Sequence, residues 1–202
     1  MGYLGTKPAN SIVVPELIAD GAITNPKIAS LAATKLTGIV PDANAPSGSV
    51  IQVVQTVKTD AFTTSSQQPT YADVTGLSVS ITPSSASNKI LVLATFQMQA
   101  NIATVTASAR LVRDSTAIFI GDANGNNSRA SAATGLSQTY SAAGSSIVFL
   151  DSPATTSSVT YKIQMAKGEG GGVVMMNRAG DDDSGFNRSR TPASITVMEI
   201  AG

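Results

Sequence analysis

Residues 48–56 read Gly-Ser-Val-Ile-Gln-Val-Val-Gln-Thr, and this stretch decides the fold. Four of the five residues from Val50 to Val54 are β-branched, and Pro46, Ser47 and Gly48 precede the stretch as a breaker. The stretch therefore predicts the first strand of a folded β domain. Because it is apolar on both faces, it favours a central place in a sheet, covered on both sides.

Alternation of apolar and polar residues predicts further strands downstream. They cover residues 77–81, 89–101, 111–113, 116–120, 145–150, 159–166, 173–177 and 194–200. Asp114 and Ser115 are predicted to form a tight hairpin turn. About nine strands with turn residues between them predict a mainly β protein, an antiparallel β-sandwich of jelly-roll-like topology.

Residues 1–47 have a different pattern. Their Ile and Leu residues recur at uneven spacings between Pro15, Pro26 and Pro41, and the only regular element indicated is a short helix at residues 26–33. These apolar residues cannot form a core alone, yet they are too frequent for a solvated linker. We therefore expect an extended arm at 1–47 whose copies pack around a shared axis, followed by a β-sandwich domain at 48–202.

Composition excludes several classes of protein. Only 13% of the 202 residues are charged and the net charge is zero, so we expect much of the surface to be buried in an oligomer. No cluster of Lys and Arg is present to bind nucleic acid. Without Cys or His there is no disulfide, no Cys/His zinc site and no Ser-His or Cys-His nucleophile. We expect no enzyme activity, no cofactor and no membrane insertion, since no apolar run is long enough to cross a bilayer.

Two loop segments resemble ligand sites only superficially. Residues 168–172, Gly-Glu-Gly-Gly-Gly, precede a strand rather than a helix, so we interpret them as a flexible hairpin loop rather than a phosphate cradle. Asp181, Asp182 and Asp183 form the densest group of carboxylates. Their spacing is not that of a calcium-binding loop, so we predict a solvated turn and no metal site, with a hard cation as the alternative.

Polar loop residues are the candidates for surface recognition. Asn and Arg side chains on loops over a rigid sandwich give directional hydrogen bonds suited to glycans or to a neighbouring subunit, although ordinary loop composition explains them equally. The candidate contact residues are Asn124, Asn126, Asn127, Arg129, Arg188 and Arg190.

The remaining polar and aromatic residues of the strands are assigned to structure. Glu199 interrupts an apolar strand, and we expect it to pair with Arg110 or Arg113, or to face an oligomer axis with bound water. Four aromatic residues are assigned to the core or to packing between chains: Phe96, Phe119, Phe149 and Tyr161.

Three strand motifs resemble a known group of proteins. They are residues 48–55, residues 77–92 (Leu-Ser-Val-Ser-Ile-Thr-Pro-Ser-Ser-Ala-Ser-Asn-Lys-Ile-Leu-Val) and residues 193–201 (Ala-Ser-Ile-Thr-Val-Met-Glu-Ile-Ala). Together they resemble the C-terminal head domain of tail-fibre-like virion proteins of bacteriophages, especially marine ones. The arm is similar to their N-terminal part, from Gly-Tyr-Leu-Gly-Thr-Lys-Pro-Ala at residues 2–9 to Lys-Leu-Thr-Gly at residues 35–38.

The resemblance implies a homotrimer located in the virion and assembled in the host cytoplasm. Its arm is expected to bind other virion proteins of the tail or of the portal and adaptor region, with Tyr3 and Leu4 as the buried docking residues. The head is expected to recognise a host surface, with a glycan as the receptor class. The arm is short for a host-binding fibre, so a head fibre, a capsid decoration protein or an adaptor with a purely structural role is the alternative.

Overall fold

The computed structural model describes residues 45–135, 142–181 and 183–202, and this part of the chain is built from strands and loops. Its strands are β1 (Val50–Lys58), β2 (Phe62–Thr64), β3 (Ala72–Ile81), β4 (Lys89–Ala100), β5 (Ala107–Arg113), β6 (Thr116–Ile118), β7 (Ala132–Thr134), β8 (Ala143–Asp151), β9 (Val159–Lys167), β10 (Val174–Met176) and β11 (Ala193–Ile200). No membrane-spanning helix occurs among the described residues. The arm lies almost wholly outside them, so its helix and its boundary with the domain stay predictions.

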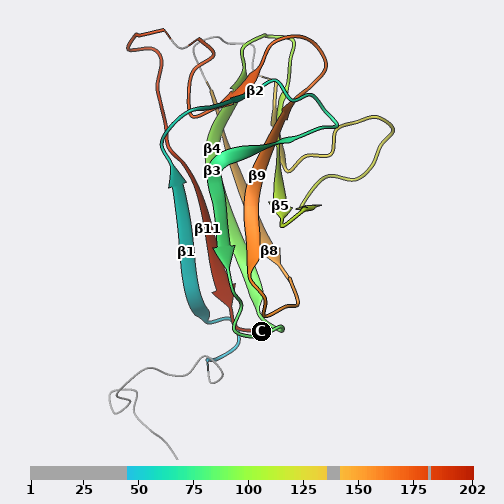
Figure 1. Ribbon diagram of the computed structural model, residues 1–202, viewed down its shortest axis with the longest axis vertical. Coiled ribbons are helices and arrows are strands. Elements are labelled where there is room, and N and C mark those ends of the chain that lie inside the picture. Colours follow the sequence, from blue (N-terminus) through green and yellow to red (C-terminus); the bar gives the residue numbers. More distant parts are fainter. Residues whose placement is uncertain (1–44, 136–141, 182) are drawn as a thin grey trace, which may run out of the picture. The chain divides into compact units, whose positions relative to one another are not determined.

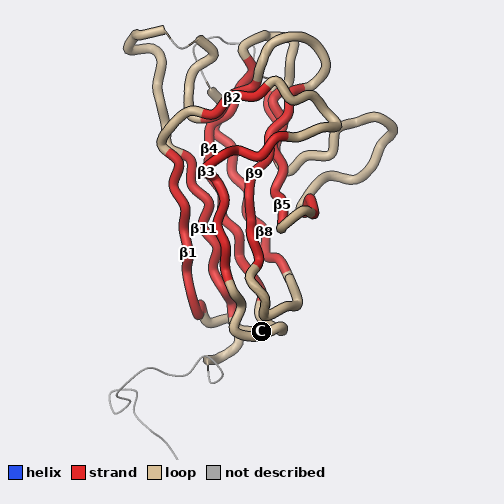
Figure 2. Tube along the Cα trace, in the orientation of Figure 1, coloured by secondary structure: helices blue, strands red, loops and turns tan. Residues whose placement is uncertain are grey.

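The strands form two sheets that pack against each other (Figures 1 and 2). Sheet A has the order β1-β11-β4-β10-β2, and β8 pairs with β4 along the edge that β11 leaves open. Sheet B has the order β3-β9-β5-β6, and β7 also pairs with β5. All of these strand pairs are antiparallel. The predicted antiparallel β-sandwich is therefore confirmed.

The inner faces of the two sheets enclose one hydrophobic core. Alternation along each strand decides which residues enter it, because successive side chains of a strand point to opposite faces. The predicted inward residues of β9 are all buried: Val159, Tyr161, Ile163 and Met165. From β3, β4 and β11 the core receives Leu77, Val79, Ile81, Ile90, Val92, Phe96, Ile195 and Val197.

The prediction that residues 50–54 lie in the middle of a sheet is wrong. Among the described strands β1 pairs only with β11, so it forms an edge of sheet A. Its outward residues Val50, Val53 and Val57 are 53%, 54% and 53% exposed. The prediction assumed that a strand with two apolar faces is covered on both of them. In the structure the outer face of β1 is apolar but exposed.

Turns and connections agree with the sequence in part. The hairpin at Asp114 and Ser115 is confirmed, because Arg113 pairs with Thr116 and Asp114 has a positive φ of 54°. The loop at residues 168–172 joins β9 in sheet B to β10 in sheet A, so it is a crossover and not the predicted hairpin loop. β2 and β7 were not predicted, because three residues are too few to show alternation.

The aromatic side chains are divided between core and surface. Phe96 and Tyr161 are buried as predicted, and half-buried Phe149 packs against the core. Phe119 lies just beyond β6 and is 46% exposed, with its ring stacked on that of Phe149 at a centroid distance of 5.0 Å.

The two ends of the domain carry different parts of the chain (Figure 1). At one end, which we call the entry end, the N–H of Gly48 donates to the carbonyl of Ala201 at 2.8 Å and the N–H of Ala201 donates to the carbonyl of Ser49 at 2.9 Å. From this end β11 extends back to Ala193, roughly 24 Å away at about 3.4 Å per residue. The loop of residues 177–192 immediately precedes Ala193, so it lies at the opposite end, which we call the loop end.

Candidate functional site

The candidate contact residues lie on two separate loops. Arg188 and Arg190 belong to the loop of residues 177–192, between β10 and β11. The loop of residues 119–131, between β6 and β7, carries Asn124, Asn126, Asn127 and Arg129. In Figure 1 the second loop projects to the right of sheet B, while the first lies at the upper left. The structure therefore does not bring the candidates together in one site.

Arg188 is held within its own loop by an acidic partner. Its Nε and one terminal nitrogen bind the two carboxylate oxygens of Asp181, the second contact at 2.8 Å. A carboxylate oxygen of Asp183 lies 3.9 Å from the same terminal nitrogen. The hydrogen bond from Arg188 holds the pKa of Asp181 below its usual value. A two-point pair of this kind fixes geometry, so Arg188 shapes the loop rather than presenting its charge outward.

This ion pair borders a hollow of about 280 Å³ at the loop end. Arg190, which is exposed, contributes to the lining, together with Arg178, Ser184 and Gly185. Both oxygens of Asp181 are engaged by Arg188, so a hard cation would have to displace the guanidinium to bind there. Asp182 lies outside the described residues, and the described ones contain no group of three or more carboxylates arranged to hold a metal ion.

The loop of residues 119–131 is folded on itself. The N–H of Asn127 donates to the carbonyl of Asn124 at 3.0 Å across a turn in which Gly125 has a φ of 55°. Nε of Arg129 donates to the carbonyl of Gly121 at 2.7 Å, so part of this side chain also serves the loop. The side chains of Asn124, Asn126 and Asn127 are exposed.

The same loop is tied to the outer face of sheet B. The hydroxyl groups of Tyr71 and Ser128 lie 2.9 Å apart, and the guanidinium of Arg110 lies 4.1 Å from the centre of the Tyr71 ring. A hollow of about 410 Å³ beside the loop is lined by Asp122, Asn124, Asn127 and small residues. Amides and hydroxyls arranged in this way can hydrogen-bond neutral polar groups such as sugar hydroxyls.

The predicted docking residues Tyr3 and Leu4 lie outside the described residues. What the structure does describe is the point at which the chain joins the domain, residues 45–49 at the entry end. The C-terminal residues lie beside it, where the N–H of Gly202 donates to the side-chain carbonyl of Asn88 at 3.1 Å.

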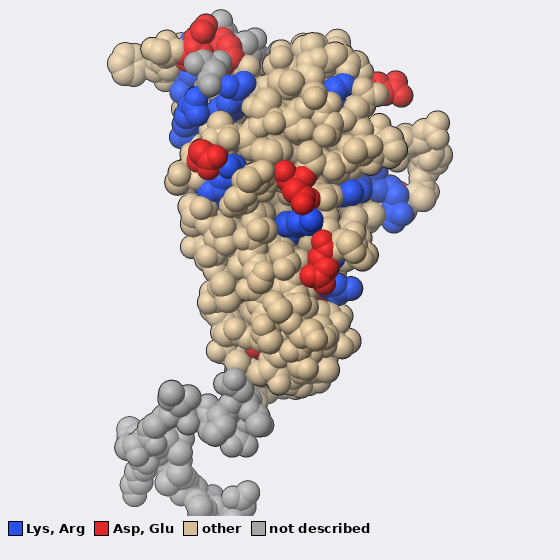
Figure 3. Space-filling view, viewed as in Figure 1, with Lys and Arg blue, Asp and Glu red and all other residues tan. Residues whose placement is uncertain are grey.

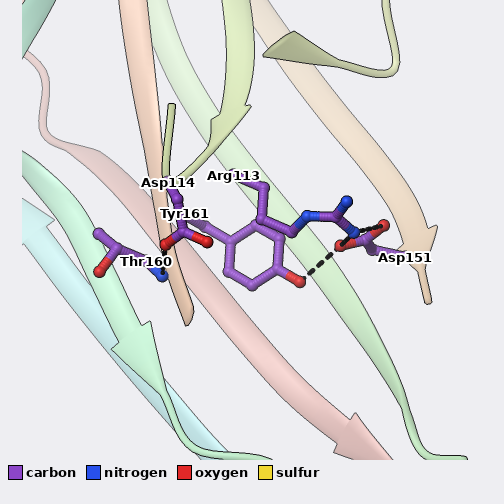
Figure 4. A network of polar contacts seen from close by, with 5 residues as sticks. All are labelled: Arg113, Asp114, Asp151, Thr160 and Tyr161. Carbon is purple, nitrogen blue, oxygen red and sulfur yellow. Dashed lines mark hydrogen bonds and ion pairs between the residues drawn. The ribbon is translucent and has the colours of Figure 1, made fainter. Parts of the chain in front are cut away.

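Sequence reasoning missed a polar network inside the domain (Figure 4). Asp151 of β8 accepts hydrogen bonds at 2.8 and 2.9 Å from Arg113 of β5 and at 2.7 Å from the hydroxyl of Tyr161 of β9. Burial, together with the bond to this carboxylate, raises the pKa of Tyr161 well above its ordinary value. Arg113 and Tyr161 come from sheet B and Asp151 from sheet A, so the network joins the two sheets. The signal in the sequence was an Asp directly after the predicted strand at residues 145–150.

The predicted pairing of Glu199 with Arg110 or Arg113 is wrong. Glu199 is fully buried, and one of its oxygens accepts hydrogen bonds from Ser84 N–H (2.7 Å), Ser84 Oγ (2.8 Å) and Asn88 Nδ2 (2.6 Å). The other oxygen accepts from Gln52 Nε2 at 2.5 Å. Burial disfavours the charged carboxylate, but these neutral donors outweigh it and lower the pKa of Glu199. Both arginines have other partners, because they lie in the opposite sheet.

Comparison with known proteins gives matches among solved structures only. No protein-family model and no curated protein matches this sequence. Solved structures with some likeness come from infectious bursal disease virus: its derived T=1 particles (14% identity, TM-score 0.41, covering 83% of this chain and 41% of that chain), its Gx strain (13%, 0.38, 82% and 46%) and its VP2 subviral particle (10%, 0.39, 83% and 43%). The chain spans less than half the length of these structures.

Proposed function

We propose that this protein is a structural virion protein of a bacteriophage, namely a tail fibre or tail-attached appendage that takes part in recognising the host surface. The observation that carries the proposal is the separation of the two ends of the domain. The chain joins the domain at the entry end, beside Ala201, and the loop with Arg190 lies at the other end of β11. An appendage needs this order, since the end that is anchored and the end that meets the host must differ.

In this proposal the protein is a homotrimer and its arm binds other virion proteins. The support is compositional: net charge is zero and only 13% of residues are charged, which suits a chain that buries much of its surface in an assembly. Three copies of one head also multiply a weak contact with a repetitive surface, because binding by one copy raises the effective concentration of the others.

The proposed receptor class is a surface glycan. Asn124 and Asn126 on one loop and Arg190 on the other are the proposed contacts, since all three residues are exposed. Arg188 is assigned to positioning of its loop, because Asp181 engages its guanidinium. A contact made by two amides and one cation is weak in a single copy and selective for geometry. We propose no catalytic role, and purified protein is expected to release no sugar from host polysaccharide.

The test uses phage particles that carry variants of this protein. The triple variant Asn124→Ala, Asn126→Ala, Arg190→Ala should be incorporated normally but adsorb to host cells at least tenfold more slowly. Thr75→Ala, an exposed change on the outer face of sheet B, is the matched control and should adsorb at the wild-type rate. Normal adsorption of the triple variant would contradict receptor recognition and favour the structural alternative. Micrographs of particles labelled on this protein would then distinguish a tail position from a head fibre or capsid decoration.

The attachment end has its own test. Changing both Tyr3 and Leu4 to Ala should yield particles that lack the protein, because large apolar residues are the usual anchors of a docking segment. Particles with the normal amount of this variant would show that the arm docks through other residues.

A further inference from the structure

The outer face of sheet A is apolar over the part nearest the entry end. In antiparallel sheets the residues that face each other across strands share one face, so the register defines rows. One row across β1, β11, β4 and β8 consists of Val53, Met198, Leu91 and Leu150. In the next row Leu93 lies beside Val148. The polar members of that row, Gln55 and Thr196, hydrogen-bond each other at 2.8 Å.

These rows are open among the described residues. Val148 is 59% exposed and Leu150 is 46% exposed, while Leu91, Leu93 and Met198 are half-buried. The two rows contain no charged residue, and Lys89 lies at the rim of the same face. A contiguous apolar surface of this kind on a sheet usually marks a contact with another molecule.

We propose that the outer face of sheet A is the contact between copies of this chain, packed toward the shared axis against the same sheet of the neighbouring copies. The inference rests on the proposed homotrimer and adds to it the surface through which the heads meet. These two rows contain no charged residue. Neighbouring copies can therefore bring their apolar side chains together and exclude water without electrostatic repulsion.

The position and size of the face favour a second copy as its partner. Residues 45–49 lead directly into β1, at the edge of this face, and 44 further residues precede them. If those arms pack around one axis, the strands that follow them lie next to that axis. The whole outer face, with the polar row of Ser194, Thr95 and Ser146 beyond the two apolar rows included, has four strands about 4.8 Å apart and roughly 24 Å long, or about 460 Å² of flat area per copy. The combined area of two such faces therefore approaches the roughly 1,000 Å² that specific interfaces bury. The uneven surface of the side chains adds further area.

The absence of cysteine makes a direct test simple. In the full-length protein, Val148→Cys is labelled with a thiol-directed photo-cross-linker and illuminated, and Ser78→Cys on the exposed outer face of β3 is the matched control. We expect covalent dimers and trimers from the Val148 variant, at least tenfold more than from the Ser78 variant. Mass spectrometry should find the cross-link on the strands of sheet A in another copy. Val53→Cys is the second position if Val148→Cys does not fold.

The other outcomes overturn the inference in distinguishable ways. Capture of a peptide from residues 1–44 would show that an arm covers the face, and capture of sheet B would show a different contact between copies. If light scattering gives a trimer mass but neither Val148→Cys nor Val53→Cys cross-links between chains, the protein is a trimer and this face is not its interface. A monomer mass for the unmodified protein would overturn the proposed homotrimer together with the interface.

Discussion

Sheet A and sheet B distribute their polar side chains in opposite ways. Sheet A holds the carboxylates of Asp151 and Glu199 on its inner face, and its outer face carries aliphatic rows. On the outer face of sheet B, Asp73 accepts hydrogen bonds from Lys162 at 2.8 Å and from Gln164 at 2.6 Å. Figure 3 shows charged side chains over the side of the domain on which β3 and β9 lie.

This difference indicates which sheet is complete without a partner. The polar groups on the outside of sheet B satisfy one another and tolerate water, as expected for a sheet that faces solvent on one side. The outside of sheet A carries two aliphatic rows near the entry end, and among the described strands its edge strand β1 is paired on one side only. The outer face of sheet B therefore suits exposure to solvent, whereas the apolar rows of sheet A have the composition of an interface.

The largest effect is expected when the outer face of sheet A is made charged, like the outer face of sheet B. The double variant Val53→Lys, Val148→Lys places two charges in the apolar rows, and we expect the trimer mass in light scattering to fall to that of one chain. The domain should stay folded, because both positions are exposed. Thr75→Lys with Ser80→Lys adds the same charge to the outside of sheet B and should leave the mass unchanged. A trimer mass for the first variant would contradict the comparison.

The inner face of sheet A can be tested separately. Asp151→Ala leaves the guanidinium of Arg113 and the hydroxyl of Tyr161 without their acceptor between the sheets. Because breaking a largely buried ion pair strands the remaining charge, we expect a loss of about 3 kcal/mol in the free energy of unfolding. Chemical denaturation measures this loss, and Asp151→Asn, which keeps the shape of the side chain, should lose less. A loss below about 1 kcal/mol would mean that the network does not join the sheets energetically.

Glu199 predicts a dependence of stability on pH. Its pKa is lower in the folded protein than its ordinary value of 4.5, so the folded state binds this proton less readily than the unfolded state does. The stabilisation is therefore fully present above about pH 4.5 and is lost as the pH falls through the folded value. Thermal melts between about pH 3 and pH 7 span this window. They should show a smaller acid-induced decrease in melting temperature for Glu199→Gln than for the wild type. Equal decreases would assign the acid sensitivity to other carboxylates.

The smallest effect is expected on the outside of sheet B. Asp73→Ala removes an exposed ion pair with Lys162, and such pairs contribute about 0.2–1 kcal/mol. The hydrogen bond from Lys162 lowers the pKa of Asp73, but water screens most of the energy of this exposed pair. Urea unfolding of this variant beside Asp151→Ala compares a pair of charges on the surface with one between the sheets. A loss as large as that of Asp151→Ala would contradict the contrast drawn between the sheets.

Local pattern predicted the fold better than it predicted the neighbours of each strand. Alternation located β3, β4, β9 and β11, because each has one face in the core. It misplaced β1, because an edge strand whose outer face is apolar and exposed has the same apolar pattern as a strand in the middle of a sheet. Nothing local shows which strands lie side by side, so the sequence could not pair Glu199 with Gln52 and Asn88, which come from distant segments.

The candidate site shows the same limit. Arg188 and Asp181 were singled out for different reasons, as a receptor contact and as part of an acidic turn, and the structure joins them in one ion pair. The exposure of Asn124, Asn126 and Asn127 was predictable from a run of polar turn residues. That the two candidate loops lie on different sides of the domain depends on the sheet order, which no local pattern contains.

The pairing of β1 with β11 has a mechanical consequence. In the proposed orientation, tension between virion and host would pull β1 toward the entry end through Gly48 and β11 toward the loop end through residue 192. The two strands are antiparallel and paired from Val50 and Ile200 to Lys58 and Ala193, so this tension acts along their axes in opposite directions. Their hydrogen bonds lie perpendicular to the strands and would be loaded in shear, all at once rather than one after another. A single-molecule pulling experiment from residues 48 and 192 should therefore require a higher rupture force than one that peels β1 away from residue 58.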